Sequence, residues 1–138
     1  MTAPSNRPAT GTFVGTLDQV LRGHGELVES VAFSPGGTLL ASGADDNTAR
    51  IWRANGQTVA TLTGHSADVN GVAWSPSGVF LASASGDKTL RLWTADGGFV
   101  RDITGHTDVV MAVAWHPDNL TLVSGSWDGT LRVWPTRK

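Results

Sequence analysis

A unit of 41 residues recurs three times along this 138-residue chain, and the repeat constrains the fold more strongly than any other feature. Each copy carries the dipeptide Gly-His near its start and a tryptophan near its end. These markers lie at Gly23-His24 and Trp52, at Gly64-His65 and Trp93, and at Gly105-His106 and Trp134. The copies align without a gap, and repeats of this length are typical of folds in which one small unit stacks on the next. We therefore expect an array of stacked units.

The apolar residues inside each unit recur with a period of two, which predicts strands and not helices. In the second copy the predicted strands are Thr58–Leu62, Val69–Trp74, Val79–Ser83 and Leu90–Trp93, and turn-forming residues separate them. Each repeat is therefore expected to form a four-stranded antiparallel meander. A single sheet of this kind has two apolar faces, so it has to stack on neighbouring sheets.

The order of these signals resembles the WD-repeat β-propeller family. Gly-His is followed by an apolar strand ending in Ser-Pro, then by Leu-Ala-Ser, Asp and the closing tryptophan, and the resemblance runs from Leu17 to Trp134. The aspartate that follows the tryptophan in this family is replaced by Arg53, Thr94 and Pro135. The resemblance implies an all-β chain with three β-propeller blades, and it implies a platform for contact with other proteins.

The composition of the chain predicts where its domains begin and end and in which cellular compartment it lies. Residues 1–11 are rich in Pro, Ser, Thr and Asn and predict a flexible tail, whereas residues 12–138 form the propeller segment, with units at about 15–55, 56–96 and 97–137. The net charge of −2 comes without a basic stripe, and no apolar run approaches the ~18 residues that a membrane span needs. We expect a cytoplasmic protein that binds neither nucleic acid nor membrane.

Each repeat also carries His, Ser and Asp at constant spacing, which a search for hydrolases would score as a catalytic triad. The family resemblance implies instead a buried hydrogen-bond chain from Asp through His and Ser to the indole of Trp. A catalytic site is seldom built three times in one small chain, so we favour the structural interpretation and expect no enzyme activity. The predicted network residues are His24, Ser42, Asp46 and Trp52, then His65, Ser83, Asp87 and Trp93, then His106, Ser124, Asp128 and Trp134.

No metal site and no cofactor are expected. The chain has no cysteine, and equivalent histidines on sheets stacked about 10 Å apart do not converge on one ion. His116 lies outside the repeat pattern and is interpreted as a turn residue. Arg50, Arg91 and Arg132 precede each tryptophan by two positions, and we expect them to pack along and pair with neighbouring blades more than to form an anion-binding ring.

Three blades do not close a ring, because propellers typically have about four to eight. No outer strand follows Trp134, and in the family's usual arrangement the N-terminus supplies that strand. We expect residues 15–22 of one copy to complete the last blade of the next, so that the ring closes by head-to-tail homo-oligomerisation. Two copies would give six blades and three would give nine. The bulky Trp74 and Trp115 favour the trimer over the dimer.

Positions that differ between the copies are candidates for partner binding. On the top face of the ring we expect an apolar patch of Val109, Met111 and Trp127 in the third copy; the alternative is that Trp127 lies flat over its own loop. The equivalent candidates are Leu27, Glu29 and Asp45 in the first copy and Asp68 and Asn70 in the second. The favoured function is a non-enzymatic scaffold for an unidentified protein or peptide. The alternatives are a hydrolase or lyase at the channel mouth, a fragment of a longer WD-repeat protein, and a duplicated array without a selected partner.

Overall fold

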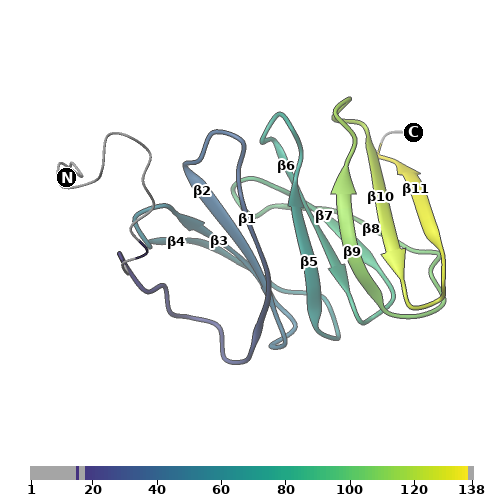
Figure 1. Ribbon diagram of the computed structural model, residues 1–138, viewed down its shortest axis with the longest axis horizontal. Coiled ribbons are helices and arrows are strands. Elements are labelled where there is room, and N and C mark those ends of the chain that lie inside the picture. The colour runs from purple at the N-terminus through teal and green to yellow at the C-terminus, as the bar shows by residue number, and fades with distance from the viewer. Residues whose placement is uncertain (1–14, 16–17, 137–138) are drawn as a thin grey trace.

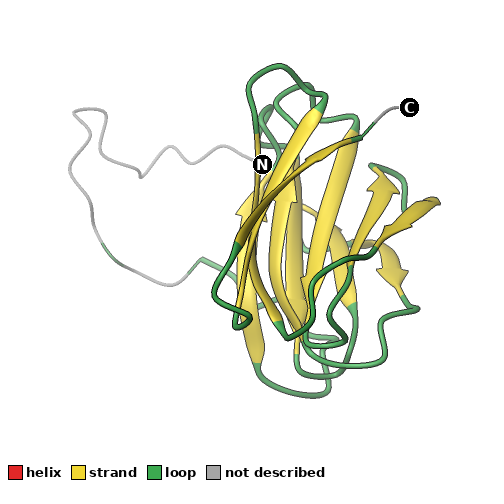
Figure 2. Ribbon diagram, turned by 90° about the vertical axis from the view of Figure 1, so that its right-hand side faces the viewer, coloured by secondary structure: helices red, strands yellow, loops and turns green. Residues whose placement is uncertain are grey.

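The computed structural model describes residue 15 and residues 18–136. Within this part of the chain every regular element is a strand, and no helix is present that could cross a membrane (Figure 2). The flexible tail predicted for residues 1–11 lies outside the described residues. The all-β prediction is confirmed.

Eleven strands form three antiparallel sheets in the described residues. The first sheet contains β1 (Val28–Phe33), β2 (Leu39–Ala44), β3 (Ala49–Arg53) and β4 (Thr58–Leu62). The second contains β5 (Val69–Trp74), β6 (Phe80–Ser85), β7 (Leu90–Thr94) and β8 (Phe99–Ile103). The third contains β9 (Val110–Trp115), β10 (Thr121–Ser126) and β11 (Leu131–Pro135). Each sheet is one propeller blade, and the three blades stand side by side (Figure 1).

The blades are offset from the sequence repeat by one strand. Thr58–Leu62 pairs with β3 across the short turn after Arg53, so it is the outer strand of the first blade and does not belong to the blade of the second repeat. The Gly-His segment that follows then carries the chain to the inner strand of the next blade. This offset explains why the third sheet has three strands in the described residues. The outer strands β4 and β8, which pair with β3 and β7, come from the start of the following repeat, whereas one edge of β11 carries no strand.

Two apolar clusters hold the blades together. The first cluster lies between blades one and two and includes Ile51 and Leu62 on one side and Val69, Val72 and Trp74 on the other. The second cluster repeats the arrangement between blades two and three, with Leu92, Ile103 and Val110 among its members. The contact is close at Gly71, where an added Cβ would lie 3.3 Å from the carbonyl oxygen of Met111. The core of this protein therefore lies in the seams between its sheets.

Residues 18–21 are not a strand in the structure, yet they occupy a defined position against the first blade (Figure 1). A Cβ on Gly56 would contact Gln19 and Leu21, in the same way as a Cβ on Gly97, its equivalent in the second repeat, would contact Ala60 and Leu62. Gln19 and Leu21 precede Ala60 and Leu62 by one repeat. Residues 18–21 thus lie beside the first blade where the outer strand of a preceding blade would lie. Leu17 is outside the described residues.

Candidate functional site: a buried polar network and three open surfaces

A chain of four hydrogen-bonded side chains runs through each repeat. In the second repeat, His65 Nδ1 lies 2.8 Å from Asp87 Oδ2, and His65 Nε2 lies 2.7 Å from Ser83 Oγ. Trp93 Nε1 donates to the same Ser83 oxygen at 2.9 Å. Equivalent contacts of 2.6–2.9 Å join His24, Ser42, Asp46 and Trp52, and join His106, Ser124, Asp128 and Trp134.

The direction of these hydrogen bonds follows from the chemistry of the groups. A carboxylate only accepts, so His65 donates from Nδ1 to Asp87 and its Nε2 accepts the hydroxyl hydrogen of Ser83. Ser83 Oγ is fully buried and accepts from the indole of Trp93 as well. A nucleophile needs access to its substrate, which this serine lacks. The arrangement has the connectivity of a catalytic triad but ties strands and loops of one blade together.

The charge states of the network agree with this interpretation. Burial lowers the pKa of His65 and keeps the imidazole neutral, although the Asp87 carboxylate opposes the shift. Burial alone would raise the pKa of Asp87, but hydrogen bonds from Thr89 and His65 outweigh it and hold this pKa below its ordinary value. In the third repeat a hydrogen bond from Thr130 is the main cause of the lowered pKa of Asp128. Each aspartate is therefore an ionised acceptor at neutral pH.

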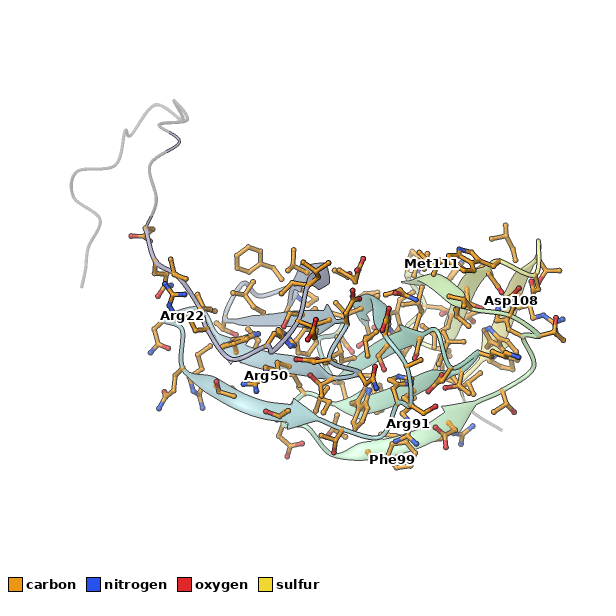
Figure 3. All side chains as sticks on the ribbon, turned by 90° about the horizontal axis from the view of Figure 1, so that it is seen from below. Arg22, Arg50, Arg91, Phe99, Asp108 and Met111 are labelled. Carbon is orange, nitrogen blue, oxygen red and sulfur yellow. The ribbon has the colours of Figure 1, made fainter. Side chains whose placement is uncertain are left out.

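The recurrent arginines pack within their own blades. The Arg91 guanidinium lies 4.7 Å from the ring centre of Phe99, and its Nε lies 2.8 Å from Asp102 Oδ1 on β8 (Figure 3). A Cβ on Gly64 would clash with Arg91 Nη1, and the φ angle of Gly64 is +138°, so the glycine of Gly-His leaves room for this side chain. The predicted pairing with neighbouring blades was wrong for Arg91, because the outer strand of the same blade supplies the carboxylate.

The top-face candidates come together in pairs. Backbone hydrogen bonds run from Asp45 N to Leu27 O at 2.8 Å and from Trp127 N to Val109 O at 2.9 Å, and Gly86 N bonds Asp68 O in the same way. Trp127 is 66% exposed. We call the edge defined by these three backbone pairs the top face. The loops that form its third-blade portion join β8 to β9 and β10 to β11 and lie at the lower edge of the view in Figure 1.

The top face also carries acidic side chains near the first seam. Burial and the neighbouring Glu29 carboxylate raise the pKa of Asp45, and Asp45 Oδ1 is buried without a hydrogen-bond partner. Asp68 belongs to the same group of carboxylates. Asn70, by contrast, uses its side chain to reach the carbonyl oxygen of Val110 at 3.1 Å and so belongs to the seam between blades two and three. Among the described residues no group of three or more acidic, histidine or cysteine side chains has the geometry to hold a metal ion.

Two further open surfaces are the end faces of the blade stack. Val28, Val31 and Phe33 of β1 are exposed, although their equivalents on β5 are buried; Val31 is 71% exposed and Val72 7%. At the other end Leu131 and Val133 of β11 are exposed, although their equivalents on β7 are buried; Leu131 is 78% exposed and Leu90 0%. We call the β1 surface the first end face and the β11 surface the last end face.

The first end face contains a hollow of about 140 Å³. Val28, Val31, Leu40 and Trp52 line it, with Leu21 among the lining residues. In the second blade the equivalent residues Val69, Val72, Leu81 and Trp93 belong to the cluster filled by Ile51 and Leu62 of the first blade. The end-face residues were not singled out from the sequence. The available signal was that the first and last repeats keep the apolar pattern of the middle repeat and carry no polar replacement.

Three comparisons with known proteins agree on the architecture. A family model described as "WD domain, G-beta repeat" matches residues 15–53, 56–94 and 97–135. The solved structures of U3-55K and of the RRP9 WD40 repeats each superpose with a TM-score of 0.82 at 29% identity, covering 85% of this chain and 38% of that chain.

Among curated relatives, the match is local. The ribosome biogenesis protein BOP1 of Rattus norvegicus is 58% identical over 33 residues, which are 24% of this chain and 4% of that protein. The BOP1 homolog of Drosophila virilis is 48% identical over 44 residues, which are 31% of this chain and 6% of that protein. The aligned segments thus cover only a small part of the length of these relatives.

Proposed function

The chain belongs to the WD40 repeat family, and we propose that it is a non-enzymatic protein-interaction scaffold whose copies assemble head to tail into a closed β-propeller. The top face of that ring would bind a protein or peptide. The observation that carries the proposal is the pair of end faces, because each is one half of a blade–blade seam that the chain already forms twice internally.

The two end faces complement each other. Leu131 and Val133 stand at the positions of Leu90 and Leu92, which pack in the seam beside Val110. In a second copy the residue equivalent to Val110 is Val28, which is exposed. Stacking the last end face of one copy on the first end face of the next would therefore repeat a packing arrangement that this sequence already adopts.

The position of residues 18–21 supports the same assembly. Leu21 lies against the first blade as Leu62 lies against the second. The free edge of β11 is the edge at which β3 and β7 receive their outer strands. Residues 18–21 of one copy would pair with β11 of another, and both the sheet and the seam would then be complete. Three copies, which would give nine blades, fit the bulky Trp74 and Trp115 side chains in the seams better than two.

The partner surface that we propose is the top face. Trp127 offers an exposed apolar anchor beside the half-buried Val109, and large exposed apolar side chains mark interaction sites. Glu29, Asp45 and Asp68 add negative charge. A peptide with an apolar side chain next to basic residues matches this chemistry. The matches to ribosome biogenesis proteins span about one repeat, so the proposal takes from them only the repeat architecture.

A random-peptide display on the assembled protein tests the partner surface. We expect enrichment of peptides that combine an aromatic or aliphatic residue with Lys or Arg, and we expect Trp127→Ala to abolish their binding while the melting temperature stays the same. Leu120→Ala is the matched control, because Leu120 is also exposed but lies in the turn between β9 and β10 at the other edge of the blade. Binding that survives Trp127→Ala would contradict the proposal, as would a Trp127→Ala protein that no longer folds.

A further inference from the structure

Side-chain hydrogen bonds cross both internal seams of the blade stack. At the first seam Trp74 Nε1 donates to Ala32 O at 3.1 Å, and Val72 N donates to Ser30 Oγ at 3.2 Å. Each internal seam is therefore more than an apolar contact, because directional bonds fix the register of one blade on the next.

The second seam uses the tryptophan again and adds two asparagines. Trp115 Nε1 donates to Ala73 O at 2.9 Å. Asn70 Nδ2 donates to Val110 O at 3.1 Å, and Ser77 N donates to Asn119 Oδ1 at 2.7 Å. In the described residues the two seams together contain four kinds of side-chain bond: one from an indole, one to a serine, one from an asparagine and one to an asparagine. Only the indole bond occurs in both seams.

A seam between two copies would lack all four. The 41-residue period identifies the residue that would stand at each position. Phe33 replaces the tryptophan and has no N–H to donate to Ala114 O. Ala112 replaces the serine, Met111 replaces the donor asparagine, and Gly37 replaces the acceptor asparagine. The apolar residues, in contrast, are retained on both end faces.

We infer that the first end face is a docking surface for the last end face of a second copy, and that this seam is held by apolar packing without the side-chain hydrogen bonds of the internal seams. The inference rests on the proposed assembly. The occupant of the hollow beside Val28, Val31 and Trp52 is then the β11 side of another copy, with Val133 in the place that Ile51 takes in the first internal seam. The ring has one kind of weak seam, and it opens and closes there while the three blades of each copy stay stacked.

The chain offers an exchange that tests this inference. Phe33→Trp adds the missing indole donor at the seam between copies, and Trp74→Phe removes the same donor from an internal seam. We expect Phe33→Trp to lower the concentration at which the assembly half-dissociates by about 2- to 10-fold per seam, the effect of one net hydrogen bond. Trp74→Phe removes one such bond from an internal seam, so it should lower the melting temperature of the single copy. It should leave the concentration at which the assembly half-dissociates unchanged within 2-fold.

Gly37→Asn is a second route to the same result. Gly37 has a φ of +76°, and Asn119, its equivalent in the third repeat, adopts +63°, so asparagine fits this backbone. It would offer a second acceptor to the Asp118 N–H of the neighbouring copy, which already donates to His116 Nδ1 at 3.0 Å, so we expect it to tighten the assembly less than Phe33→Trp does.

Mass photometry over a dilution series gives the readout for all three variants and the parent chain. An assembly that is tightened by Phe33→Trp or by Gly37→Asn supports the inference. A parent chain that assembles, with neither variant tightening it, overturns the inference and leaves the proposed assembly standing. A parent chain that is monomeric at every concentration overturns both.

Discussion

The indole nitrogen of Trp74 lies 3.1 Å from the carbonyl oxygen of Ala32, and this contact joins two different sheets. The same side chain is buried among the apolar residues of the first seam. One residue therefore supplies both the apolar area and the directional bond that align two blades. A chain built this way gains its stability from stacking, and a blade without a neighbour leaves a complementary surface exposed.

We predict that Ser83→Ala destabilises the fold by about 2–4 kcal/mol, because it leaves the buried Trp93 N–H and His65 Nε2 without partners. Urea unfolding followed by tryptophan fluorescence measures the change. Ser66→Ala is the control, because Ser66 is exposed and the substitution keeps its backbone N–H, which donates to Asp87; it should cost less than about 0.5 kcal/mol. A Ser83→Ala protein as stable as its parent would show that the network is not structural, and an esterase activity lost with Ser83 would point to catalysis.

We predict that the free energy of unfolding decreases in two steps as the pH is lowered. The pKa of His65 is lowered by burial in the folded chain, so the unfolded chain takes up its proton first as the pH drops below about 6.5, and the free energy of unfolding decreases from there. The pKa of Asp87 is also lowered in the folded chain, and its contribution is lost as the pH falls below about 4.

Urea midpoints between pH 8 and pH 3 measure both steps. A stability that stays flat or rises between pH 7 and pH 5 would contradict the assigned neutral state of His65.

Leu131→Asp and Val31→Asp should each prevent assembly, because each places a charge on an apolar end face. Both side chains are exposed in the single copy, so its free energy of unfolding should change by less than about 1 kcal/mol. A head-to-tail seam joins two different faces. Mixing the two variants therefore leaves one intact pair of faces, which predicts an open dimer and no ring. Size-exclusion chromatography with light scattering distinguishes these states. Assembly of either variant alone to the size of the parent would exclude the end faces as the interface.

The strands and the polar network could be predicted from the sequence because their signals are local and repeated. The period-two pattern around Val69–Trp74 identifies a strand. The spacing from His65 to Ser83 to Asp87 is the same in all three repeats, although their surface residues differ. Because the pattern occurs three times, each strand or network residue assigned in one repeat can be checked against the same position in the other two.

Two features depended on contacts that the pattern does not encode. The outer strand Thr58–Leu62 belongs to the blade before its own repeat, because antiparallel pairing across the short turn after Arg53 joins it to β3. Arg91 finds Asp102 on the outer strand of its own blade. The seam bonds were not predicted for a different reason. Ser30, Asn70 and Asn119 occupy positions where the three copies differ, and such positions were interpreted as candidates for partner binding, as Asn70 was.

The mass of the purified chain in solution tests the central claim most directly. Native mass spectrometry at several concentrations should find a single closed species of about three times 14.4 kDa, which corresponds to nine blades. A species of twice 14.4 kDa would keep the closed ring but reduce it to six blades. A monomer that remains monodisperse at every concentration would contradict assembly through the two end faces.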